Sequence, residues 1–80
     1  MQDQEILSRI SRLVDEEHQL LKREESGELA DPDNRRMKEL EVALDQCWDL
    51  LRQRRARREF GQNPDEAEVR PADIVENYKQ

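Results

Sequence analysis

Apolar residues recur along the chain in two stripes with heptad spacing, and one short polar segment separates the stripes. The first stripe contains Leu7, Ile10, Val14 and Leu21, with Ile6, Leu13 and Leu20 beside it, and the second contains Met37, Leu40, Leu44, Cys47 and Leu51. Because residues seven apart return to the same side of a helix, the stripes predict two amphipathic helices, over about residues 3–25 and about residues 32–60. The apolar face of the first helix is wider than a two-stranded seam, so we expect this helix to contact two neighbours.

The polar segment between the stripes carries residues that end one helix and begin the next. Ser26-Gly27 provides the exit, because glycine adopts a left-handed conformation without a side-chain clash. Asp31 is expected to cap the second helix, and Pro32 suits its first turn, where no N–H is required. Gly61 should end that helix. Since the connection is short, the two helices should pack antiparallel.

The last residues, 62–80, form a tail that contains the same kinds of helix-starting and helix-ending residues as the hairpin at residues 1–61. Asn63-Pro64-Asp65-Glu66 resembles a capped helix start. A final short helical segment, which carries Ile74, Val75 and Tyr78, is too short to persist alone in water. Together with Val69, which precedes Pro71 by two residues, these residues form the apolar part of the tail. We favour docking of these residues over Trp48 and the bundle flank. The alternative is a linear docking motif for another protein.

The fold class predicted from these patterns is all-α: an antiparallel, coiled-coil-like two-helix hairpin that dimerises into a four-helix bundle, with the tail outside it. A lone hairpin would leave one flank of the first helix exposed, and such a patch usually marks an interface. The candidate interface residues are Leu7, Ile10, Val14, Glu17, Leu21, Leu44, Trp48 and Leu51. Opposed hairpins would place each arginine block beside Glu24, Glu25, Glu28 and Asp31 of the other copy. Dimer and tetramer both remain open.

Composition limits the other possibilities. Of 80 residues, 34% are apolar and 42% are charged, against about 45–50% and about 25% in ordinary globular domains, so one small domain with a marginal core is expected. The net charge of −6 disfavours nucleic acid and anionic lipid as partners. No apolar run is long enough to span a membrane, and the start lacks the features of a secretory signal. One cysteine suits a reducing compartment, so we expect a cytoplasmic protein.

Five arginines lie close together near the end of the second helix: Arg52, Arg54, Arg55, Arg57 and Arg58. They are candidate phosphate-binding residues, because guanidinium groups match phosphate oxygens. Binding of nucleic acid or a nucleotide through these residues is the alternative function. However, residues 49–60 carry +3, whereas residues 1–27, 28–48 and 61–80 each carry −3. We therefore favour internal pairing, with Arg54 and Arg58 opposite Asp3 and Glu5.

Two further residues interrupt the apolar pattern. Glu17 occupies a stripe position between Val14 and Leu21, where a carboxylate costs stability but can fix register or oligomeric state. We interpret Glu17 as a specificity residue paired across an interface, with a ligand contact as the alternative. Trp48 lies at the edge of the second stripe, where an aromatic residue commonly anchors a neighbouring helix or tail.

Catalytic and metal chemistry find little support. Asp15 and His18 have the i, i+3 spacing of di-metal bundles, but Asp15 points away from the apolar face while Glu17 points toward it. Cys47 falls in the seam, where a free thiol behaves as a small hydrophobic residue, and nothing nearby would activate it as a nucleophile. We expect no metal, no cofactor and no enzyme activity. The leading function is a self-associating module that binds another protein.

The segment from Glu39 to Ala56, ELEVALDQCWDLLRQRRA, is followed by Asn63-Pro64-Asp65 and Val69-Arg70-Pro71. In these residues the chain resembles a group of short actinobacterial proteins catalogued as a domain of unknown function. The resemblance covers nearly the full length. It implies a free-standing cytoplasmic protein and brings with it no activity, cofactor or catalytic residue.

Overall fold

The computed structural model describes the backbone of residues 2–77 and the side chains of residues 2–75. It contains the helices α1 (Asp3–Glu25), α2 (Asp31–Glu59) and α3 (Ala72–Asn77), with the short 3-10 helix η1 (Pro64–Glu66) between α2 and α3. No strand occurs among the described residues, so the all-α class is confirmed. Tyr78, one of the predicted docking residues of the tail, lies outside the described residues. Within residues 2–77, no helix combines the length and apolar content that crossing a membrane requires.

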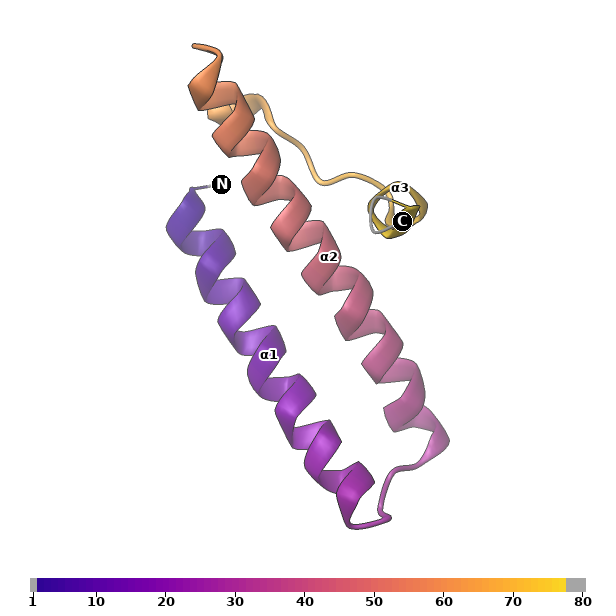
Figure 1. Ribbon diagram of the computed structural model, residues 1–80. Helices are drawn as coiled ribbons and strands as arrows, with labels where there is room; N and C mark the ends of the chain where they lie inside the picture. Colours follow the sequence, from indigo (N-terminus) through magenta and orange to yellow (C-terminus); the bar gives the residue numbers. More distant parts are fainter. Residues whose placement is uncertain (1, 78–80) are drawn as a thin grey trace.

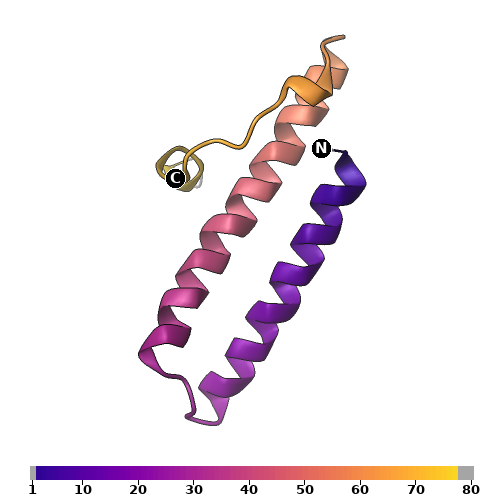
Figure 2. The same ribbon diagram turned by 180° about the vertical axis from the view of Figure 1, so that it is seen from behind.

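The two long helices lie side by side and run in opposite directions (Figures 1 and 2). Ion pairs join them in antiparallel order along their length: Asp3 with Arg54 and Arg58, Glu16 with Arg36, and Asp33 with Arg23. The N-terminal end of α1 lies beside the C-terminal end of α2, and the loop connects the two helices at the opposite end. The predicted two-helix hairpin is therefore confirmed.

Each long helix ends two residues before a glycine. Gly27 and Gly61 have φ of 73° and 70°, in the left-handed region that glycine adopts at least cost. The predicted role of Asp31 is wrong: Asp31 is already the first residue of α2, and Ala30 precedes it as the N-cap. Asp33 supplies the cap instead, because its Oδ2 accepts a hydrogen bond of 3.2 Å from the Ala30 N–H.

The core of the hairpin is a narrow seam between α1 and α2. Its buried apolar members are Ile6, Ile10, Leu20, Leu40, Cys47 and Leu50. The prediction that Ile10 lies at an interface between copies is wrong. Ile10 is only 6% exposed and packs in the same cluster as Cys47 and Leu50. Ile10 therefore belongs to the interior of a single copy and offers no surface to a second one.

The tail crosses α2 on the flank that faces away from α1 (Figures 1 and 2). Val75 of α3 is 2% exposed, whereas Ile74 and Val69 remain 44% and 56% exposed. The expected covering of Trp48 is only partial, since 47% of this side chain stays exposed. One apolar residue of the tail is thus buried, Ala67 packs against the core of the hairpin, and polar contacts complete the docking.

Candidate interaction face and arginine cluster

One face of the hairpin carries a second apolar stripe that the hairpin itself covers only in part. We call it the open face and define it by six residues: Leu7, Val14, Leu21, Leu44, Trp48 and Leu51. Leu7, Trp48 and Leu21 are 48%, 47% and 38% exposed, and the other three are half-buried. The stripe arises because α1 and α2 both carry apolar residues beyond the width of the seam between them.

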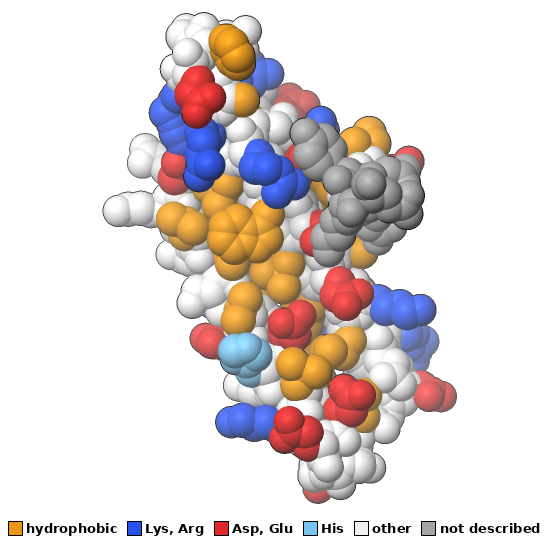
Figure 3. Space-filling view, viewed as in Figure 1, with side chains coloured by type: hydrophobic (Ala, Val, Ile, Leu, Met, Phe, Trp, Pro, Cys, Tyr) orange, Lys and Arg blue, Asp and Glu red, His pale blue; other side chains and the backbone are white. Residues whose placement is uncertain are grey.

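The open face is continuous and is bordered by charge of both signs. Figure 3 shows a band of hydrophobic side chains along the two long helices, with basic side chains at its upper end and acidic side chains beside its lower half. Two shallow grooves lie along it and meet at Trp48 and Arg52. The acidic groove is lined by Glu17, Glu41, Leu44, Asp45, Trp48, Arg52 and Val75, and the basic groove by Asp3, Leu7, Trp48, Leu51, Arg52, Arg55 and Arg58.

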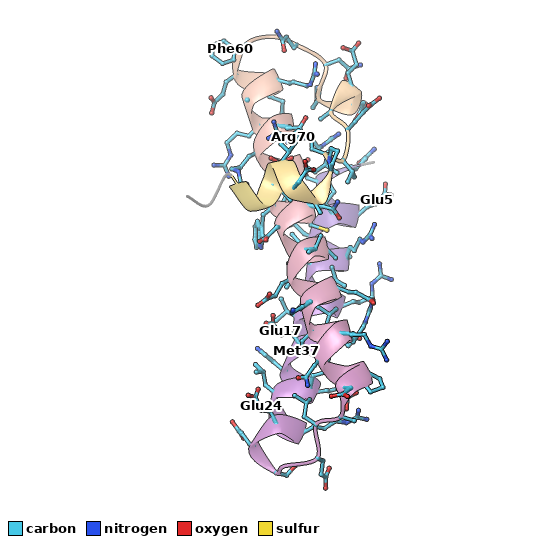
Figure 4. All side chains as sticks on the ribbon, turned by 90° about the vertical axis from the view of Figure 1, so that its right-hand side faces the viewer. Glu5, Glu17, Glu24, Met37, Phe60 and Arg70 are labelled. Carbon is cyan, nitrogen blue, oxygen red and sulfur yellow. The ribbon has the colours of Figure 1, made fainter. Side chains whose placement is uncertain are left out.

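Glu17 lies in the acidic groove, at a height along the hairpin similar to that of Met37 (Figure 4). It is half-buried, and no hydrogen bond or ion pair within residues 2–75 engages its carboxylate. Glu41 lines the same groove and likewise has no such contact there. Two carboxylates, of half-buried Glu17 and exposed Glu41, thus lie with Arg52 in the groove that Leu44 and Trp48 line.

Arg54 is the centre of the arginine cluster and joins three segments of the chain. It is 7% exposed, and its Nε donates to Asp3 Oδ1 at 2.5 Å. Its Nη1 donates to Asp65 Oδ1 at 3.0 Å and to the Pro64 carbonyl at 3.1 Å. The hydrogen bond from Arg54 holds the pKa of Asp3 below its ordinary value, and the same contact raises the pKa of Arg54.

The other arginines differ in how far the fold engages them. Arg58 donates to Asp3, Arg57 lies 3.6 Å from Glu66, and Arg52 lies 4.0 Å from Asp49. Arg55 alone among the five has no hydrogen bond or ion pair within the described side chains. The predicted pairing with Asp3 is confirmed. Glu5 accepts a hydrogen bond from the Gln2 N–H at its own helix end and forms no ion pair with these arginines within the described side chains.

A buried polar junction ties the tail to α2, and the sequence patterns did not predict it. Asp49 is fully buried, and Arg70 donates to it from both Nε, at 2.8 Å, and Nη2. Gln53 donates to Asp49 Oδ2 at 2.9 Å and to the Glu68 carbonyl at 2.8 Å. Gln46 donates to the Arg70 carbonyl at 3.1 Å. The hydrogen bond from Arg70 lowers the pKa of Asp49 despite its burial.

Two features could have revealed this junction. Asp49 stands within an otherwise apolar stretch of α2, and Gln46 and Gln53 lie seven residues apart on the same side of the helix. Figure 4 shows Arg70 beside α3, where the tail crosses α2. A single acidic residue is a weak pattern, and its partner lies 21 residues away in the chain, so spacing alone could not identify the pair.

Two further candidates, Cys47 and His18, line neither groove. Cys47 is 7% exposed, and burial raises the pKa of its thiol, which favours the unreactive protonated form. His18 is exposed on α1. Within the described part of the chain, no three His, Cys, Asp or Glu side chains are grouped so as to hold a metal ion.

Comparison with known proteins identifies relatives over nearly the whole chain. The family described as "Protein of unknown function (DUF2630)" matches residues 2–80. The chain is 48% identical over 77 residues to "Uncharacterized protein Rv0898c" of Mycobacterium tuberculosis (strain ATCC 25618 / H37Rv), covering 95% of this chain and 88% of that protein. "Uncharacterized protein Mb0922c" of Mycobacterium bovis shows the same identity and coverage. No solved structure matches the chain. The predicted resemblance is confirmed, and the chain belongs to the DUF2630 family.

Proposed function

We propose that this chain is a non-enzymatic protein–protein interaction module that associates with a second copy of itself through the open face. The observation that carries this proposal is the exposure of Leu7, Leu21 and Trp48 along one continuous apolar band. Small monomeric proteins rarely leave so much of their apolar side chains in one exposed band, and bands of this kind commonly mark protein interfaces. Pairing two hairpins through it would form a four-helix bundle.

A second copy fits this face better than an unrelated partner because the face is self-complementary. A two-fold interface brings the same patch of both subunits together, so each charge must find its opposite elsewhere in that patch. The open face meets this requirement, since the acidic groove lies on one side of Trp48 and the basic groove on the other. The same pairing would shelter Glu17, whose carboxylate lies beside Leu44.

The arginine cluster supports this assignment over phosphate binding. Arg54, Arg57 and Arg58 are already held by carboxylates of α1 and the tail, and guanidinium groups that are neutralised in this way attract phosphate weakly. We also propose a cytoplasmic location, because the buried free thiol of Cys47 suits a reducing compartment.

Sedimentation equilibrium from about 1 to about 100 µM, a range that covers moderate affinities, tests self-association directly. The wild-type chain should sediment as a dimer at the upper end of this range. Trp48→Glu should sediment as a monomer with unchanged helical circular dichroism. Phe60→Glu is the matched control, because Phe60 is 78% exposed and lies outside both grooves. A wild-type chain that stays monomeric and folded throughout would refute the proposal.

A further inference from the structure

We infer that the second copy docks antiparallel to the first, with the two Trp48 side chains at the two-fold axis and Arg55 of each copy paired with Glu41 of the other. This inference rests on the proposed self-association and specifies its geometry. It identifies the pair of charges that aligns the two copies, and it replaces the expected pairing of the arginine block with Glu24, Glu25, Glu28 and Asp31.

The spacing of three residues in α2 carries the argument. Glu41, Trp48 and Arg55 are seven residues apart in sequence, so they lie along one side of the helix with steps of about 10.5 Å. Turning such a line by 180° about its central tryptophan places the arginine of one copy over the glutamate of the other. Both ends of the line are then paired at once.

The contacts within one copy leave these two charges available. Glu41 lines the acidic groove and Arg55 the basic groove, and Trp48 lines both. Neither Glu41 nor Arg55 has a hydrogen bond or ion pair within residues 2–75, whereas the neighbouring Arg54 and Arg58 both engage Asp3. Because Glu17 lies in the acidic groove as well, the incoming Arg55 would meet two carboxylates.

The apolar residues around Trp48 agree with the same axis. Leu44 precedes Trp48 by four residues and Leu51 follows it by three, so a rotation at Trp48 brings Leu44 of one copy close to Leu51 of the other. Leu7 shares the basic groove with Trp48 and Leu51 and would enlarge this apolar centre. A parallel arrangement would instead oppose Glu41 to Glu41 and Arg55 to Arg55, which like charges disfavour.

Disulfide trapping tests the geometry, using the full chain with Cys47→Ser to remove the native thiol. Glu41→Cys and Arg55→Cys chains should cross-link rapidly when mixed, because the two positions face each other. Each chain alone should not, since two copies of position 41 would be about 21 Å apart and a disulfide needs Cα atoms within about 7 Å. Cross-linking of either chain alone in preference to the mixture would overturn the inference, as would a mixture that does not cross-link.

Charge reversal gives an independent readout. Glu41→Arg and Arg55→Glu should each raise the dimer dissociation constant at least about tenfold, and the double variant should return it to within about threefold of wild type. Circular dichroism checks that each chain is folded. A wild-type monomer would refute self-association itself, whereas a wild-type dimer without recovery in the double variant would refute only this geometry.

Discussion

Asp49, fully buried in α2, accepts two hydrogen bonds from the guanidinium group of Arg70, which belongs to the tail. A buried carboxylate without a cation would be strongly disfavoured, so this pair determines where the tail can dock. Gln46 and Gln53 reinforce it by donating to backbone carbonyls of the tail. The position of α3 therefore depends on these directional polar contacts as well as on the burial of Val75.

Arg70→Ala should release the tail and lower the free energy of unfolding by about 1–3 kcal/mol, because Asp49 loses its charged donor. The cost is limited, since a detached tail lets water reach the carboxylate. Limited proteolysis should then cleave residues 62–71 faster, and urea titration followed by circular dichroism gives the stability change. Arg70→Lys keeps the charge but not the paired donors, so its stability should lie between those of the wild type and Arg70→Ala. Unchanged proteolysis of Arg70→Ala would contradict the role given to this pair.

Arg54→Ala should destabilise the hairpin by about 2 kcal/mol, because a nearly buried guanidinium joins Asp3, Pro64 and Asp65. The matched control is Arg12→Ala. Arg12 is exposed on α1 and has no ion pair within residues 2–75, so its removal should change stability by less than about 0.5 kcal/mol. Equal losses in thermal denaturation of the two variants would argue against a structural role for Arg54.

Acid should weaken the fold in a defined range of pH. The pKa values of Asp3 and Asp49 are lowered in the folded chain by the hydrogen bonds from Arg54 and Arg70, respectively. Their contribution to stability is therefore complete above the unfolded pKa of about 3.9 and is lost as the pH falls through the lower folded values. Urea midpoints should stay level near neutrality and drop below about pH 4. Asp49→Asn should flatten this drop, and a drop of the same size in that variant would exclude Asp49 as a source.

Glu17→Leu should raise the melting temperature by about 5 °C, because an apolar residue replaces a half-buried carboxylate. The same change should loosen the oligomeric state, since a single charged seam position often selects one assembly. Light scattering should then show species other than the dimer. Glu24→Leu is the control: Glu24 lies one heptad further along α1 (Figure 4), is exposed and lines neither groove. A lower melting temperature with one oligomer would contradict the role assigned to Glu17.

The long helices could be predicted because heptad spacing and glycine both act locally. The stripe positions require only knowledge of helical periodicity, and Gly27 ends α1 through a property of its own backbone. The cap was harder to predict, because Asp31 and Asp33 are two residues apart and either carboxylate can reach free N–H groups. Only the actual start of α2 decides in favour of Asp33.

The division between core and open face could not be taken from the pattern alone. Ile10 and Leu7 belong to the same broad stripe, yet Ile10 is buried and Leu7 is 48% exposed. The rotation of α1 against α2 decides between them, and that rotation depends on the whole interface rather than on any local spacing. The junction of Asp49 with Arg70 was missed for a related reason, since its two residues meet only after the tail has folded back.

The sequence contains a single tryptophan, and the structure leaves nearly half of Trp48 open to water in one copy. An indole ring emits at shorter wavelengths when water is excluded from it. The intrinsic fluorescence of the unlabelled chain is therefore a direct optical gauge of whether anything covers this particular surface, and simple dilution in a cuvette is enough to use it.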